Sequence, residues 1–283
     1  MICFILLYSC FVTDEPFVHL GPWTAPLIST VAFPSLSSLA PNWSFILQNI
    51  STAPLWEYLP HGPGKHPTLI QGYCRQRELL FGLLNRTDVG ALEIMADSIG
   101  TLTNAIQHPF SRGSVRALSA DILTGGSVAA NVALDPRYCA QPEDCEILLA
   151  GLRFTGQLVS TTSMRELVPN PPSPWNETIA TGPVNETALL QAIRDEVTTE
   201  FHPSGTTSMM PIELGGVVSP RLAVYGMANL RVVDAGIIPL IPAAHLQAAV
   251  YAIAEKVIKF LSQGSILLDQ NILTTLEPRH PDE

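Results

Sequence analysis

The last third of the chain contains its clearest pattern of apolar and polar positions. After Pro239 and Pro242, apolar residues recur at three- and four-residue spacings on one face: Leu246, Val250, Ile253, Val257 and Leu261. This spacing predicts an amphipathic helix, and Gly264 is a typical residue at which such a helix ends. We expect His245 to lie in the first turn of this helix.

A second stripe precedes this helix in the sequence. Its apolar residues are Leu190, Ile193, Val197 and Phe201. Acidic residues lie off the stripe, as is typical of a helix with one face in water. The pattern therefore predicts a helix that ends near Phe201, with His202 at its C-terminal end.

Other segments give weaker predictions. Residues 114–118 alternate well enough to predict a strand, and residues 230–234 read as a buried strand that ends in an acid. Pro142 opens a helical pattern with acids in its first turn. Proline and glycine punctuation predicts loops with short helical pieces in 13–80, and an exposed connection in 167–184.

Composition narrows the class of protein. The chain has 283 residues, 47% of them hydrophobic, with a mean hydropathy of +0.25, so it can bury a substantial core. The formal net charge is -10 and only 14% of residues are charged. Nucleic acid is therefore excluded as the main partner, because binding phosphates requires clustered Lys and Arg.

The N-terminus is apolar and reads MICFILLYSCFV. This run is too short to span a bilayer, so we expect no stable membrane span. It fits the apolar region of a signal peptide, but the first basic residue is Lys65 and the usual positive start is missing. A buried segment of an incomplete chain explains the run equally, and both readings stay open.

Two features are typical of the secretory pathway. Glycosylation sequons begin at Asn42, Asn49, Asn85, Asn176 and Asn185. Cys139 and Cys145 bracket a short loop, and they could form a disulfide or remain two unpaired core thiols. On this basis we expect a glycoprotein that is secreted or retained in the secretory pathway.

Several kinds of chemistry find little support in the residues. There is no cluster of His and Cys with metal-ligand spacing, so no metal site is expected. The segment 125–129, GGSVA, lacks the last glycine of a hydrolase nucleophile elbow, and HGPG at 61–64 only faintly matches an oxyanion loop. His202 and His245 remain as candidates, although buried histidines are often structural.

Five motifs in order resemble the C-terminal half of the glucose–methanol–choline (GMC) oxidoreductases, most closely the fungal members. They are HPFSRGSVRALS (108–119), DPRY (135–138), FHPSGTTSM (201–209), GGVVSPRLAVYGMANLRVVDAGIIP (215–239) and HLQAAVYAIAEKVIKFL (245–261), with a weaker GPWTAPL near Gly21. The resemblance implies a mixed α+β and α/β fold, in which a substrate domain on an antiparallel sheet is followed by the returning part of the FAD-binding domain.

The resemblance also implies domain boundaries. We expect a hydrophobic start at 1–19, the substrate-binding domain at 20–200, the returning segment of the FAD-binding domain at 201–264, and a tail at 265–283. The dinucleotide fingerprint G-x-G-x-x-G occurs nowhere in the chain, so the N-terminal Rossmann half that carries it in the family is expected to be absent.

The site residues follow from the matched positions. His202 resembles the family's catalytic base and His245 its second active-site histidine. The expected FAD contacts are Asp234, Ala235, Gly236, Leu246 and Gln247. These positions imply an alcohol oxidase or dehydrogenase in which hydride passes from a CH–OH group to flavin N5.

The resemblance leaves wider roles open. It implies a small-molecule alcohol as substrate, oxygen or another compound as electron acceptor, a homodimer, and a place in fungal secondary metabolism. Thr207 stands where many members have cysteine, and Ser219 replaces a usual aspartate. The alternative is an inactive truncated remnant or a binding module without the half that holds the FAD phosphates.

Overall fold

A five-stranded antiparallel sheet forms the centre of the fold. The computed structural model describes residues 3–7, 28–54, 57–60, 66–97, 102–119, 131–167 and 185–260. Along the sheet the strands run β2 (Ile28–Ala32), β3 (Leu92–Asp97), β4 (Leu102–Ile106), β1 (Cys3–Leu7) and β7 (Thr198–Thr199). The predicted antiparallel sheet with helices is confirmed, and part of the apolar N-terminal run forms β1 within it.

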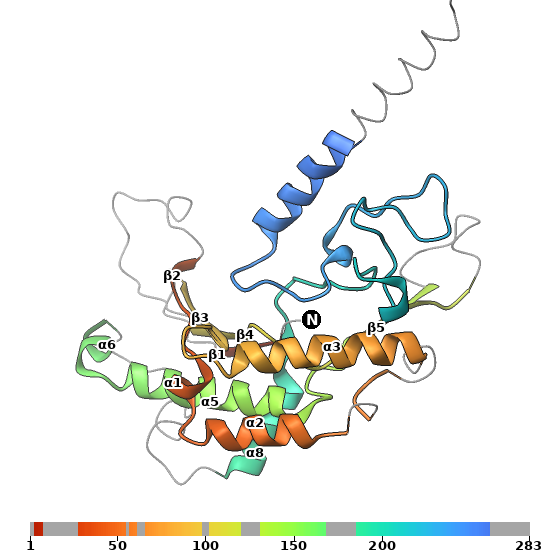
Figure 1. The fold of residues 1–283 in the computed structure, drawn as a ribbon. Coiled ribbons are helices and arrows are strands. Elements are labelled where there is room, and N and C mark those ends of the chain that lie inside the picture. The colour runs from red at the N-terminus through yellow and green to blue at the C-terminus, as the bar shows by residue number, and fades with distance from the viewer. Residues whose placement is uncertain are drawn as a thin grey trace, which may run out of the picture.

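Helices cover one face of this sheet. They are α1 (Leu36–Leu39), α2 (Trp43–Thr52), α3 (Pro67–Leu84), α5 (Pro142–Val159), α6 (Thr162–Leu167) and α8 (Glu186–Glu196). A further helix at 247–260, blue in Figure 1, lies apart from this layer. α5 begins at Pro142 as predicted, and it contacts both β3 and β4. Gly151 allows this close approach, because a Cβ there would lie 2.4 Å from Leu92 Cδ2.

The two faces of the sheet support different parts of the chain. Side chains alternate along a strand, so Leu92 and Ile94 of β3 lie in the main core with α5. Met95, on the opposite face, packs with Ile241 and Leu246 from the C-terminal part of the chain. A sheet with apolar residues on both faces can thus hold the helical layer on one side and the later motifs on the other.

The prediction of loops with short helices for 13–80 is wrong at its C-terminal end, where α3 is a regular helix of 18 residues. His66 is the N-cap, its side chain accepts a hydrogen bond from the Thr68 amide, and Pro67 occupies the first turn. Tyr73, Leu80 and Leu84 are buried at helical spacing. The prolines and glycines before α3 led to the loop prediction, although this apolar spacing is present in the sequence.

Two further predictions need correction. The helix α8 ends at Glu196, so Phe201 and His202 lie beyond it, because Thr198–Thr199 is extended and pairs with β1. Residues 230–234 form no regular strand. Arg231 makes only an isolated bridge with Ala223, and Leu230 is 48% exposed. An apolar run without a neighbouring strand along its length cannot build a ladder.

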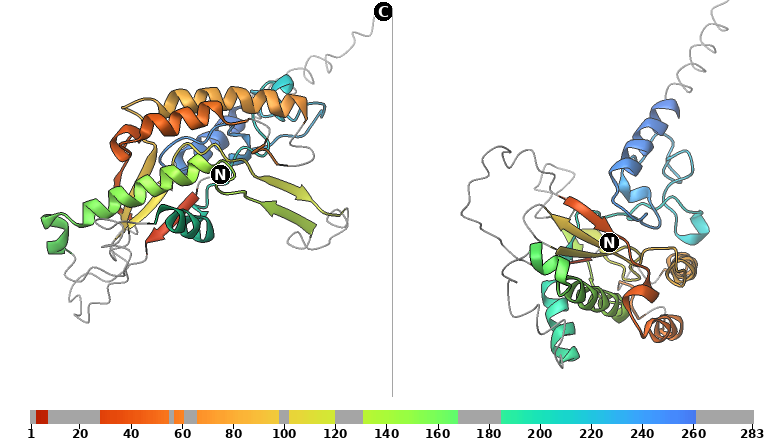
Figure 2. Two further views of the ribbon diagram at one scale, coloured as in Figure 1. Left: turned by 90° about the horizontal axis from the view of Figure 1, so that it is seen from below. Right: turned by 90° about the vertical axis from the view of Figure 1, so that its left-hand side faces the viewer.

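Outside the sheet, β5 (Ser114–Ala117) and β6 (Val132–Asp135) form a hairpin that projects from the body (Figure 2). The strand predicted at 114–118 is therefore confirmed. Cys139 and Cys145 form a disulfide, which settles the choice left open by the sequence. Within the described residues, no helix is long and apolar enough to cross a membrane.

The sequons that the structure describes lie at helix ends or on α2. Asn42, Asn85 and Asn185 are exposed, and Asn49 is half-buried. Their glycosylation stays a prediction. Several predictions concern residues outside the described ranges: Asn176, the exposed connection from 168 to 184, Gly264, the tail at 265–283, most of the 1–19 start, and the weak motifs at 21–27, 61–64 and 125–129.

Candidate active site

Two turns in left-handed backbone bring His202 and His245 toward one point. Phe201, immediately before His202, has a φ of 63°. At the other turn Ala244 and His245 have φ values of 63° and 69°, just before the helix at 247–260. His245 thus precedes the first turn in which we expected it. Such backbone is unfavourable for residues other than glycine, so the surrounding contacts must hold both turns in place.

The two imidazoles are in direct contact. His202 Nε2 lies 2.8 Å from His245 Nδ1, a hydrogen-bond distance, and the rings meet edge to face with their centroids 5.0 Å apart. The residues are separated by 43 positions in the sequence. The structure therefore places the two predicted catalytic histidines in one site.

Glu200 joins this pair. Its Oε2 lies 3.2 Å from His202 Nε2, and its Oε1 lies 3.3 Å from His245 Nδ1. Burial raises the pKa of Glu200 to about 7, the nearby Glu93 charge acts in the same direction, and His245 opposes them. Burial also lowers the pKa of His202. Near neutral pH the site can therefore hold a proton on Glu200 while His202 is a neutral imidazole.

The sheet holds the second histidine from behind. Glu93 of β3 is buried, and its Oε1 lies 3.2 Å from His245 Nε2. Gln107, just after β4, donates from Nε2 to Glu93 Oε2 at 3.2 Å and accepts at Oε1 from the Ala244 amide at 3.0 Å. This one buried side chain connects the sheet carboxylate to the strained turn before His245.

Sequence reasoning did not identify Glu200, Glu93 or Gln107 as site residues. A usable signal was present for Glu93, because it is the single charged position in the apolar run Leu92–Ala96. A carboxylate on a buried strand requires a partner. Glu200 lies only two positions before His202, but the predicted helix placed it on a solvated face.

The predicted flavin contacts lie in two segments, 234–236 and 246–247, which pack against each other. The Asp234 side chain accepts from the Gly236 amide at 2.7 Å and caps the short helix η5 (Ala235–Ile237). Ala235 packs in the same small apolar cluster as Leu246. Asp234 and Gln247 are exposed, whereas Gly236 and Leu246 are buried. The structure thus brings residues 234–236 and the start of the helix at 247–260 together.

The motif 201–209 lies directly on η5. The Thr207 amide donates to Gly236 O at 2.9 Å, and the Met209 amide donates to Ile237 O at 2.8 Å. A Cβ at Gly236 would lie 2.5 Å from Thr207 Oγ1, so this close approach needs glycine. Thr207 Oγ1 is buried and has no hydrogen-bond partner among the described residues.

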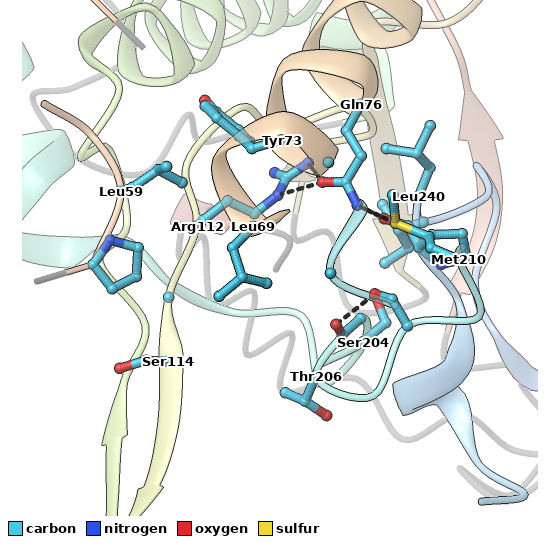
Figure 3. A pocket seen from close by; sticks show the side chains of 18 of the residues that line it. Leu59, Leu69, Tyr73, Gln76, Arg112, Ser114, Ser204, Thr206, Met210 and Leu240 are labelled. Atoms are coloured by element: carbon cyan, nitrogen blue, oxygen red, sulfur yellow. Dashed lines mark hydrogen bonds between the residues drawn. The ribbon is translucent and has the colours of Figure 1, made fainter. Parts of the chain in front are cut away.

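A cavity of about 440 Å³ lies between α3 and the later motifs (Figure 3). Arg112 lies 5.4 Å from the centre of the Tyr73 ring and donates to Gln76 Oε1 at 3.3 Å. Gln76 in turn donates to Pro239 O at 3.1 Å. Among the described residues that line the cavity neither histidine occurs, so it is separate from the histidine site.

Comparison with known proteins gives consistent matches. Residues 109–254 match the sequence family described as GMC oxidoreductase. The chain is 30% identical over 230 residues to the GMC oxidoreductase family protein Mala s 12 of Malassezia sympodialis, covering 80% of this chain and 35% of that protein. It is 37% identical over 154 residues to a glucose oxidase-like protein of Humicola fuscoatra, covering 52% and 24% respectively. The chain spans well under half the length of these relatives.

Solved structures give the same answer for the fold. A fungal aryl-alcohol oxidase superimposes with a TM-score of 0.76 at 27% identity, over 94% of this chain and 47% of that one. An FAD-dependent oxidoreductase from Chaetomium thermophilum superimposes with a TM-score of 0.73 at 26% identity, over 84% and 39%.

Proposed function

The chain belongs to the GMC oxidoreductase family, and from this premise we propose that it supplies the histidine site of an FAD-dependent oxidation of CH–OH groups. The observation that carries the proposal is the contact of 2.8 Å between His202 Nε2 and His245 Nδ1. A pair of imidazoles can accept the proton that an alcohol must lose as it becomes a carbonyl. Membership of the oxidoreductase family does not depend on this step.

FAD is the cofactor of the proposed reaction, and the residues present fit its flavin end. Among the described residues Thr207 Oγ1 is a buried hydroxyl without a partner beside η5, and the helix at 247–260 begins directly after Leu246, which packs with Ala235 of η5. Asp234, Ala235, Gly236, Leu246 and Gln247 would hold the ring. When bound, the flavin supplies the hydride acceptor at N5.

Protein side chains handle the proton. Because burial lowers the pKa of His202, its imidazole is neutral near pH 7, and its Nε2 can take the hydroxyl proton of the substrate in place of its contact with His245 Nδ1. The electron pair of the adjacent carbon–hydrogen bond would go with its hydrogen to the flavin acceptor as hydride, which would leave an aldehyde or ketone. His245 lies on the other side of the shared hydrogen bond and orients the same hydroxyl.

Glu93 and Gln107 act on His245 rather than on substrate. Their contacts reach its Nε2 and the amide of Ala244. Both side chains are buried, with 1% exposure each, so they hold a defined geometry. We propose that they keep the His245 ring in the orientation that leaves Nδ1 facing His202.

A small-molecule alcohol is the proposed substrate, and the disulfide with the exposed sequons supports a secreted or secretory-pathway protein. The second candidate is a binding module or inactive remnant, the alternative that the family resemblance leaves open. The two candidates differ in one cheap measurement: flavin absorption of the purified chain after FAD is added and excess is removed. Retained flavin supports the oxidoreductase.

The base assignment is tested by His202→Ala in a flavin-loaded preparation. Removing a general base lowers kcat by roughly 10²- to 10⁴-fold. The matched control is His66→Ala, since His66 is exposed and caps α3 far along the chain from the motif. A variant that keeps its flavin and turns over at the unchanged rate would refute His202 as the base.

A further inference from the structure

Glu200 and the two histidines bring their possible ligand atoms close to one another. Atoms of Glu200, His202 and His245 that could each hold a metal ion lie within 4.8 Å of one another. We propose that these three residues form a binding site for a divalent transition cation of the Zn²⁺ type. The proposal goes beyond the oxidation reaction and does not depend on it.

The contact behind His245 determines what its inner nitrogen can offer. His245 Nε2 faces Glu93 Oε1 at 3.2 Å. A proton on that Nε2 leaves a lone pair on His245 Nδ1, and a neutral His202 with its proton on Nδ1 has its lone pair on Nε2, beside the carboxylate of Glu200. Converging lone pairs require a positive charge between them. One proton can satisfy the histidine pair, whereas a divalent cation satisfies all three groups.

The distances suit such an ion. Ligand atoms at 2.0–2.1 Å from a tetrahedral Zn²⁺ lie about 3.3 Å from one another. The corresponding distances here are 2.8 Å between the histidines and 3.2 and 3.3 Å from them to Glu200. Seating the ion therefore requires the imidazoles to separate by about 0.5 Å as the shared proton leaves.

The donor set selects the class of metal. Two imidazoles and one carboxylate suit Zn²⁺, Cu²⁺ or Ni²⁺, whereas Mg²⁺ and Ca²⁺ prefer sets made of oxygen alone. The side chains of His202 and His245 are 20% and 30% exposed. A fourth position can therefore be taken by water from the solvent side.

An independent observation supports the site from the sheet. Glu93 is 1% exposed, and its Oε1 makes no regular hydrogen bond among the described residues although it faces His245 Nε2. A ligating histidine typically gives its other ring N–H to a carboxylate, which orients the ring and increases its basicity. Gln107 fixes the second oxygen of Glu93 at 3.2 Å. The site thus has three possible ligands and a buried carboxylate behind one of them, His245.

A cation at this point would occupy the nitrogen proposed to accept the substrate proton. Metal and alcohol would then compete for one site, and the metal would act as a reversible inhibitor of an otherwise active enzyme. Binding itself is measured without flavin or substrate. Its failure and the failure of the proposed oxidation are therefore separate results.

The test uses the 283-residue chain, freed of metal with a chelator and titrated with Zn²⁺ by calorimetry. We expect one site per chain whose affinity falls at least tenfold in His202→Ala and in Glu200→Gln, and is unchanged in the control His66→Ala. Glu93→Gln should weaken binding by roughly 10- to 100-fold, as expected for a carboxylate behind a ligating histidine. Circular dichroism of each variant establishes that it is folded.

X-ray absorption at the zinc edge keeps the proposal falsifiable if one variant fails to fold. The expected shell contains two imidazole nitrogens and one carboxylate oxygen at about 2.0–2.1 Å. No Zn²⁺ binding, affinity unaffected by both Glu200→Gln and His202→Ala, or a shell without imidazole would each overturn the proposed site.

Discussion

A body, residues 28–199, and a C-terminal segment, residues 201–260, differ in the contacts that stabilise them. The body has one continuous core in which α5 packs on β3 and β4. The C-terminal segment has two small apolar clusters, one on the sheet and one around Val218 and Val257. Its remaining order comes from backbone hydrogen bonds between its loops. The body supplies most of the buried core, and the segment supplies both histidines of the site.

This difference matters for the site because the site crosses the boundary. Glu93 and Gln107 belong to the body, Glu200 and His202 lie where the two regions meet, and His245 belongs to the segment. The geometry of the histidine pair therefore depends on how firmly the segment docks on the sheet. Large apolar side chains in the segment remain exposed, including Phe201, Met227, Leu230, Tyr251 and Ile258. Docking thus leaves much apolar surface uncovered.

The largest expected difference comes from truncating one core residue in each region. Leu148→Ala in α5 removes a fully buried side chain and should lower the free energy of unfolding by about 3 kcal/mol. Val257→Ala, in the small cluster of the segment, should cost about 1 kcal/mol. Urea denaturation followed by circular dichroism measures both. Equal losses would show that the two regions share one cooperative core.

Removing the disulfide tests whether its contribution to stability is confined to the body. Cys139 and Cys145 are six positions apart, and closing a loop of that length is worth about 2 kcal/mol in the chain-entropy description. The double variant to alanine should therefore unfold at lower urea, while the alignment of His202 and His245 is retained. The control is Cys74→Ala, which removes a free thiol. A double variant as stable as the parent would contradict the prediction.

The side-chain N-caps of one helix in each region provide a comparison with a smaller expected effect. The Asp234 side chain caps η5 in the segment, and the Asn185 side chain accepts from the Ala188 amide at the start of α8 in the body. Changing either to alanine should cost about 1 kcal/mol. We expect Asn185→Ala to reduce global stability, but Asp234→Ala to appear mainly as faster hydrogen exchange at Gly236 and Ile237. Faster exchange throughout the chain after Asp234→Ala would argue against a separately held segment.

Local signals in the sequence account for the elements that could be predicted. Pro142 followed by acids predicts the start of α5, and residues 114–118 predict β5. The end of α8 could not be predicted in the same way. Its apolar stripe continues to Phe201, but Thr198–Thr199 pairs with a strand almost 200 positions earlier, and this distant pairing ends the helix.

The site residues likewise divide into those that the sequence predicts and those whose role depends on distant contacts. His202 and His245 could be named from their motifs. Gln107 could not, and Glu93 carried only the signal of a charge within an apolar run, because the role of both arises only when β3 and β4 pair and present both side chains on the face that meets Ala244. The resemblance therefore predicts which groups react, whereas the folded sheet decides what holds them.

The last comparison concerns pH, because Glu200, at the junction of the two regions, and His108, in the body, act on stability with opposite sign. Burial raises the pKa of Glu200 to about 7. The folded state therefore binds more protons at this position than the unfolded chain between the ordinary pKa of 4.5 and 7, and stability from Glu200 is lost as pH rises through that window. Glu200→Gln should remove this slope.

In the body, burial lowers the pKa of His108, and both of its ring nitrogens lack hydrogen-bond partners among the described residues. The unfolded chain then binds the proton first as pH falls below 6.5, so the stability from a neutral buried His108 is lost toward acid pH. His202 acts in the same direction. Unfolding free energies measured from pH 4.5 to 7.5, with a chelator present, should show His108→Leu less acid-sensitive than the parent. A parallel pH profile for His108→Leu would mean that His108 gains a proton or a partner in the folded body, and that the contrast between the regions does not extend to charge.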